Sequence, residues 1–206
     1  MTILKDIYKS IFGKDYGPVW QQFAKDSRGT YSPISDDRVE FPYKDFTITF
    51  DAYTHLTVVG GSSYEHEYTR GLVEFISPDS FKLLITQQGF IDNVGKLFGT
   101  QDIQIGDKQF DKKFIVKSND EGKALLTLSN NSITKALQDL KTVRLDITDS
   151  EGLWSEKPKE GNFMLYYVLD DKITHIDQLN KVYRLFADTL DTLIKLDSIK
   201  PTKASS

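Results

Sequence analysis

The chain has 206 residues, of which 39% are hydrophobic, and is therefore long enough to bury a core without a disulfide or metal staple. It has no cysteine, which excludes disulfides, thiolate metal sites and cysteine nucleophiles. Its 26 basic and 30 acidic side chains give a net charge of −4 and are interspersed along the chain, so we expect no nucleic-acid binding.

A membrane-spanning segment and a signal peptide are both missing from the sequence as it stands. No stretch approaches the roughly 20 apolar residues that a transmembrane helix requires. The N-terminus lacks the continuous apolar segment and small-residue cleavage site of a secretory signal. Because cysteine is also absent, the sequence predicts a soluble, cytoplasmic protein.

Two amphipathic helices are expected at the N-terminus. In residues 3–12 the apolar side chains recur at helical spacing, and residues 18–25 form a second helix that turns Trp20 and Phe23 inward. Lysines flank the apolar stripe of residues 1–26, which leaves open whether this segment packs on the domain or attaches to a membrane surface.

From residue 27 to residue 86 the pattern changes to the period of two that strands show. Residues 38–41 and 46–53 are predicted to form a hairpin. Gly60-Gly61 is a turn between two further strands, and Pro78-Asp79 precedes another strand.

The second half of the chain alternates helical and strand patterns. The expected helices are 90–98, 129–140 and 174–196, and the expected strands are 101–105, 112–116, 141–148 and 162–170. Thr174, with Asp177 three residues later, resembles a capping box at the start of the last helix.

Together these elements predict one α+β domain over residues 1–196. Its antiparallel β-sheet carries N-terminal helices, mid-chain helices and a long C-terminal helix packed on the sheet. A division near Gly99 or Gly106 is the alternative. Residues 197–206 lose the pattern and are predicted to be a disordered tail.

The stretch FDKKFIVKSND, residues 110–120, combines charges with an apolar alternation. Phe110, Phe114 and Val116 fall on alternating positions, as expected around the strand 112–116, and Ser118 or Asp120 can cap a short helix that follows. The alternative is that Asp111, Ser118 and Asp120 form a polar site where the strand meets the helix.

The same stretch resembles a family of uncharacterised bacterial proteins of unknown function. Members share an Asp-x-x-Phe-x-Val-x-Ser-x-Asp run, then a Leu-Leu pair and a short helix, and the similarity extends over approximately residues 60–196. The matching positions are Asp111, Phe114, Val116, Ser118, Asp120, Leu125 and Leu126. The resemblance implies the fold and no catalytic residue; in many relatives membrane-spanning segments precede this domain.

Signatures of catalysis and of cofactor binding are missing. The VVGGSSYE stretch lacks the lysine and the glycine spacing of a phosphate loop, and no G-x-S-x-G elbow occurs. Acid pairs such as Asp36-Asp37 and Asp170-Asp171 lie in turn-like surroundings, where we expect them to be solvated. A metal site through His55 and His66 lacks an evident third ligand. No cofactor, metal or catalytic residue is therefore predicted.

Tyrosines cluster on the predicted strands. Tyrosine suits a surface that is half apolar and half wet, although edge strands also favour it. The candidate binding surface consists of Tyr53, Tyr64, His66, Tyr68, Tyr166 and Tyr167.

We therefore predict a non-enzymatic binding or interaction domain that contacts a protein partner or an apolar small ligand, and leave homo-oligomerisation open. The alternatives are a peripheral membrane protein attached through residues 1–26 and an enzyme using His66 with nearby acids.

Overall fold

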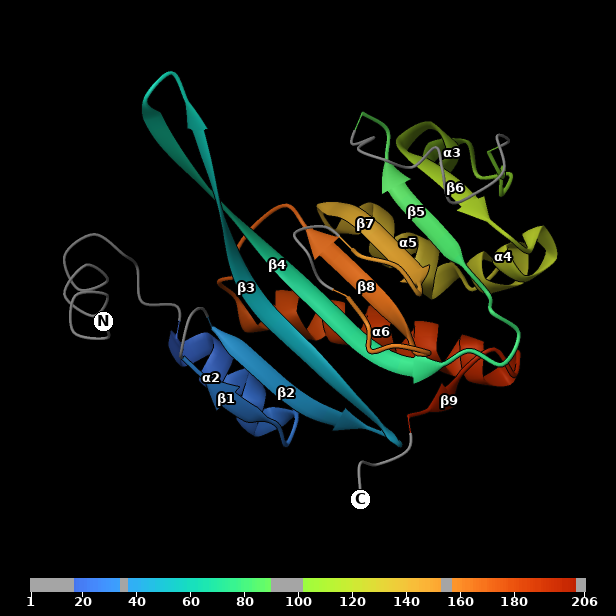
Figure 1. Ribbon diagram of the computed structural model, residues 1–206, viewed down its shortest axis with the longest axis horizontal. Helices are drawn as coiled ribbons and strands as arrows, with labels where there is room; N and C mark the ends of the chain where they lie inside the picture. The colour runs from blue at the N-terminus through green and yellow to red at the C-terminus, as the bar shows by residue number, and fades with distance from the viewer. Residues whose placement is uncertain (1–16, 34–36, 90–101, 153–156, 203–206) are drawn as a thin grey trace.

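The computed structural model describes residues 17–33, 37–89, 102–152 and 157–202 (Figure 1). Within these residues nine strands form one sheet in the order β1-β2-β3-β4-β8-β7-β5-β6, with β9 paired to β4. The strands are β1 (Thr30–Ser32), β2 (Arg38–Tyr43), β3 (Phe46–Val59), β4 (Ser62–Ile76), β5 (Leu83–Gln87), β6 (Phe114–Ser118), β7 (Thr142–Thr148), β8 (Phe163–Leu169) and β9 (Lys200–Pro201). The helices are α2 (Gly17–Asp26), α3 (Lys108–Lys113), α4 (Glu121–Leu128), α5 (Asn131–Asp139) and α6 (Ile176–Lys195).

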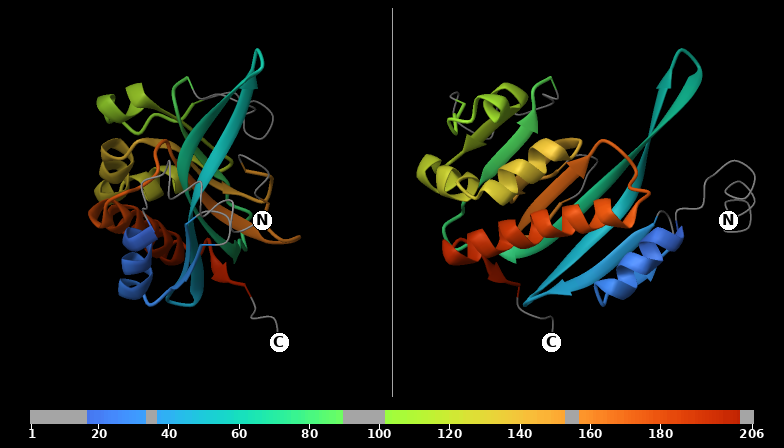
Figure 2. Two further views of the ribbon diagram at one scale, coloured as in Figure 1. Left: turned by 90° about the vertical axis from the view of Figure 1, so that its left-hand side faces the viewer. Right: turned by 180° about the vertical axis from the view of Figure 1, so that it is seen from behind.

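The predicted α+β class is confirmed. The strand pairs are antiparallel, and the helices gather on one side of the sheet (Figure 2). The hydrophobic core lies between α2, α5, α6 and this face of the sheet. The expected helices 3–12 and 90–98 lie outside the described residues.

Helix α2 turns its apolar side toward the core, as the pattern of residues 18–25 predicted. Trp20 and Phe23 are buried, and the Trp20 indole donates a hydrogen bond of 3.1 Å to the carbonyl of Ile173. The Phe23 ring meets Phe41 of β2 edge to face, with centroids 5.3 Å apart. The apolar side of residues 17–26 is therefore not exposed to a membrane surface.

Helix α6 buries a continuous apolar face against the sheet, which confirms the predicted long C-terminal helix. The predicted capping box is wrong: His175 is the N-cap, and it makes no side-chain cap hydrogen bond. The preceding Ile173 is held in the loop because its amide donates to Thr69 of β4. This tertiary contact holds the loop that leads into the helix.

The stretch that begins at Phe110 differs from its predicted form. Phe110 lies in α3, where Asp107 caps the helix by accepting from the amides of Gln109 and Phe110, and the strand begins at Phe114. Residues 101–105 are not a strand where the structure describes them, although the amide of Ile103 donates to the carbonyl of Val116.

The predicted disordered tail, 197–206, is wrong for residues 197–202. Ser198 and Ile199 are buried, and β9 pairs with the end of β4 through Phe75 and Ile76. The Ser198 hydroxyl donates to Asp79, which ties the segment to the β4–β5 turn. A two-residue strand is too short to show a period, so the sequence pattern could not reveal it.

Candidate binding surface

The outer halves of β3 and β4 form a hairpin that projects beyond the body of the protein (Figure 1). Pairing of β2 with β3 ends at Asp51, and pairing of β8 with β4 begins at Thr69. Residues 54–67, which we call the arm, therefore pair in strands only with each other within the described ranges. Gly60 and Gly61, with φ of 59° and 83°, form its tight turn.

The arm carries most of the large apolar side chains that are exposed in the described chain. These are Leu56, Val58, Val59 and Tyr64, whose exposed fractions lie between 56% and 67%. Within the described residues only two leucines of α4 join them. A cluster of exposed apolar side chains on one projecting element is typical of an interaction site.

The strand register places the aromatic residues on one face of the hairpin. Tyr53 pairs with Tyr68 and His55 pairs with His66, while Tyr64 lies opposite Thr57. Because alternate side chains share a face, this face continues the side of the sheet opposite the helices. The structure thus brings together Tyr53, Tyr64, His66 and Tyr68 of the candidate surface, and adds His55.

The other two candidates, Tyr166 and Tyr167, are fully buried and do not belong to a surface. They lie in β8, between β4 and β7, where both faces of the strand are covered. Tyr167 faces the core, where its hydroxyl shares a hydrogen bond of 3.1 Å with Thr142, and burial raises the pKa of this hydroxyl above its usual range.

A buried ion pair fixes the base of the arm. Arg70 of β4 donates two hydrogen bonds of 2.8 Å to the carboxylate of Asp51, its cross-strand neighbour on β3. Both side chains are less than 10% exposed, and the Tyr53 ring stacks over the guanidinium at 4.1 Å. A bidentate pair of this kind fixes geometry, so the arm leaves the sheet in a defined direction.

His66 lies beside a carboxylate of the loop that follows β8. Its Nε2 lies 2.6 Å from Oδ1 of Asp170, and the two side chains are about half exposed. Within the described residues no group of three or more His, Asp or Glu side chains could hold a metal ion. Both side chains are therefore in contact with solvent, unlike those of a desolvated acid–base pair.

The expected solvation of Asp36-Asp37 is wrong for Asp37, and Asp36 lies outside the described residues. Asp37 is buried, accepts a hydrogen bond of 2.6 Å from the Tyr31 hydroxyl and lies 3.4 Å from the Lys172 ammonium. The carbonyl of Asp37 also accepts from the amide of Ala52 on β3. These contacts hold Asp37 against the base of the arm.

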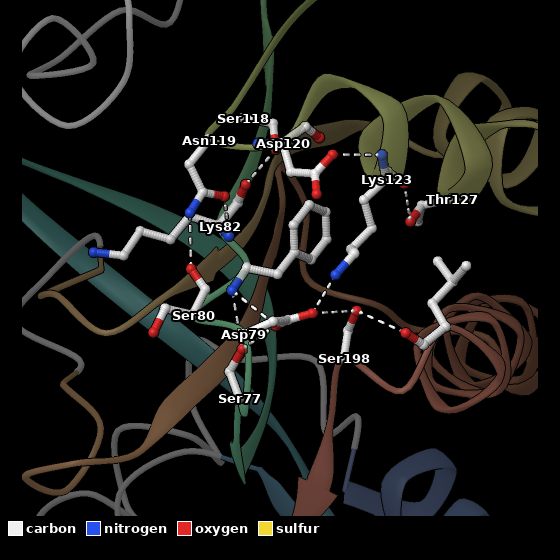
Figure 3. Close-up of polar contacts among 12 residues, drawn as sticks. Ser77, Asp79, Ser80, Lys82, Ser118, Asn119, Asp120, Lys123, Thr127 and Ser198 are labelled. Atoms are coloured by element: carbon white, nitrogen blue, oxygen red, sulfur yellow. Dashed lines mark hydrogen bonds and ion pairs between the residues drawn. The ribbon is translucent and has the colours of Figure 1, made fainter.

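The polar residues of FDKKFIVKSND serve two separate structural purposes. Asp120 is the N-cap of α4, and the Ser118 hydroxyl donates to the carbonyl of Lys82 (Figure 3). Asp111 instead accepts from the amides of Ile105 and Gly106. The three side chains do not converge on one site, so the predicted cap is confirmed and the polar site is not.

Asp79 lies at the centre of the same polar cluster (Figure 3). It pairs with Lys123 of α4 and accepts hydrogen bonds from Ser77, Ser198 and the Phe81 amide. Burial alone would raise the pKa of Asp79, but the hydrogen bonds from Lys123 and the other donors outweigh it and hold the pKa below its usual value. The polar groups of this cluster form hydrogen bonds and an ion pair with one another, and so hold the β4–β5 turn against α4.

No protein-family model matches the chain, and none of the curated proteins is similar to it in sequence. The resemblance to an uncharacterised bacterial family therefore stays a prediction. One solved structure is similar in fold: the crystal structure of the mycobacterial trehalose monomycolate transport factor A, TtfA, with a TM-score of 0.51 and 8% sequence identity. The similarity covers 92% of this chain and 98% of that chain, and it concerns the fold alone. None of the helices that the structure describes is long and apolar enough to cross a membrane.

Proposed function

We propose that the chain is a non-enzymatic binding domain that contacts a partner protein through the arm. The observation that carries this proposal is the projection of a two-stranded ribbon on which Leu56, Val58, Val59 and Tyr64 are exposed. Exposing these side chains to water is unfavourable unless a partner covers them.

The chemistry of the arm favours a protein over the other ligand classes. Its residues include Glu65 and Glu67 but no lysine or arginine, so anionic lipid headgroups would be repelled rather than attracted. An apolar small molecule is bound best in a concave pocket, whereas a projecting ribbon is convex. Strand edges and alternating side chains are what a protein partner recognises by strand addition.

The likeness to TtfA is compatible with this proposal. That protein is named a transport factor. We propose that the present chain acts by binding, and that its partner is to be identified from the arm and not from the fold.

The test compares two sets of exposed leucine, valine and tyrosine substitutions. The arm variant L56S/V58S/Y64S removes apolar side chains from the ribbon, and the matched control L125S/L126S removes the exposed leucines of α4. Each protein is purified under mild conditions and examined by native mass spectrometry and affinity capture. We expect wild type and control to retain the same protein partner and the arm variant to lose it.

Two results would count against the proposal. Retention of the partner by the arm variant would show that the ribbon is not the contact surface. A small-molecule adduct that persists in all three proteins would point to a ligand site elsewhere.

A further inference from the structure

The outer edge of β3, Leu56–Val59, lacks the features by which proteins protect exposed strand edges. Natural edge strands carry charged side chains, prolines or bulges that block pairing with another chain. The four residues LTVV contain no charge and no proline, and their pairing with β4 is regular. Within the described residues no other strand lies along this edge.

The edge of β4 in the arm is different, because it is charged and partly occupied. Glu65 and Glu67 lie on it, and the loop that follows β8 reaches it: Asp170 pairs with His66, and Lys172 lies 3.4 Å from Glu67. A strand approaching β4 would meet these acids and this loop. The receiving edge is therefore that of β3.

We propose that the partner on this edge is a second copy of the chain, whose β3 pairs antiparallel with β3 about a two-fold axis at Thr57. This inference rests on the proposed function and names its partner. In that register Thr57 lies opposite its own copy, and Leu56 lies opposite the partner's Val58. Since the axis repeats each rung, the apolar Leu56–Val58 rung occurs twice on the same face.

Charge and strand number both favour this pairing. Each chain carries a net charge of −4, but Leu56–Val59 brings no ionised group to the contact, so the two copies do not repel each other there. A two-stranded ribbon is only marginally stable by itself, and additional paired strands stabilise it. Two joined arms form four adjacent strands.

The chain is free of cysteine, so single cysteines report the contact directly. In an antiparallel pair, opposing Cα atoms lie about 4.5–5.5 Å apart, within the range that a disulfide bridges. Thr57→Cys is placed on the proposed axis, and Ser63→Cys is the matched control, exposed and on the neighbouring strand β4. Both are oxidised under the same conditions and compared on non-reducing gels.

We expect Thr57→Cys to form a disulfide-linked dimer at least tenfold faster than Ser63→Cys. Adding Val58→Lys should abolish this difference because it places a charge in the apolar rung, and adding Leu126→Lys, on α4, should not. Sedimentation equilibrium of the cysteine-free protein should show a dimer that Val58→Lys converts to a monomer.

Equal cross-linking at positions 57 and 63, or a monomer at every concentration, would overturn this inference. If the arm variant L56S/V58S/Y64S still loses a captured protein that is not this chain, the proposed function stands and only the identity of the partner is wrong. If the variant loses neither a second copy nor any other protein, both proposals fail.

Discussion

Gly71 of β4 allows α6 to pack directly on the sheet, and its replacement by alanine tests this packing. A Cβ at this position would lie 2.6 Å and 2.7 Å from two ring carbons of Phe186 and 3.0 Å from a ring carbon of Phe50. Both rings are fully buried, and their centroids lie 5.1 Å apart. The added methyl group therefore has no space unless these rings move.

The expected loss of stability follows from two opposing contributions. Overpacking a closed core costs about 1–3 kcal/mol. Replacing a glycine in a strand by alanine gains about 0.5–1 kcal/mol in backbone entropy. We therefore expect Gly71→Ala to lower the free energy of unfolding by about 0.5–2 kcal/mol. For a chain of this length, each kcal/mol lost lowers Tm by about 2–4 °C.

Chemical denaturation with an unchanged m-value measures this loss. Gly122→Ala is the matched control, because its Cβ would meet only Asp120 Oδ1 at 3.6 Å in helix α4, and it should raise stability by up to about 1 kcal/mol. Phe186→Leu makes room for the methyl group, so the double variant with Gly71→Ala should be more stable than the sum of the single effects predicts. A Gly71→Ala protein as stable as wild type, or strictly additive effects in the double variant, would refute the packing argument.

Three further predictions concern the polar contacts. Arg70→Met leaves the buried Asp51 carboxylate without its bidentate partner and should lower the free energy of unfolding by about 3–5 kcal/mol. In denaturant titrations the double variant R70M/D51L should recover most of that loss. Equal losses of stability in the single and double variants would contradict the pairing. The pKa of Asp79 is lowered in the folded state, so its contribution is fully present above its ordinary value of 3.8 and is lost as pH falls through the lower folded pKa. Asp79→Asn should accordingly flatten the acid side of a stability–pH curve, and an unchanged curve would contradict this assignment. Asp120→Ala removes the N-cap of α4 and should cost about 1 kcal/mol by thermal melting, while Asp120→Asn should cost little; equal losses would show that the cap hydrogen bond is not the cause.

The periodic elements of this fold could be predicted because each carries its apolar side chains on one face. In residues 38–41 and 46–53 apolar and polar side chains alternate along the sequence. Helix α6 carries an apolar stripe at helical spacing along its 20 residues. These strands and this helix therefore follow from the local sequence pattern. The incorrect predictions concern elements that are too short to show a pattern and segments held by a contact that is distant in sequence. Helix α3 has only six residues, too few to outweigh the alternation that begins at Phe110. The loop that leads into α6 is held by Thr69, which is more than one hundred residues away in sequence.

Two residues of the candidate surface, Tyr166 and Tyr167, are buried for a related reason: exposure depends on strand order, which is not a local property. The tyrosines of β4 and β8 look alike in composition, yet Tyr64 projects on the arm and Tyr166 lies inside the sheet.

The residues around each tyrosine do distinguish the two strands. FMLYYVL in β8 is a continuous apolar run, typical of a strand covered on both faces, whereas SSYEHEY in β4 alternates aromatic with acidic side chains. An acidic neighbour keeps one face of a strand in water, so an aromatic residue on the other face must be covered by another part of the protein or by a partner. For Tyr68 at the base of the arm, the sheet supplies part of that cover, since this side chain is half-buried. Tyr64 near the tip, beyond the last strand pair that β4 makes with β8, is 62% exposed, which is why the proposed contact lies on the arm.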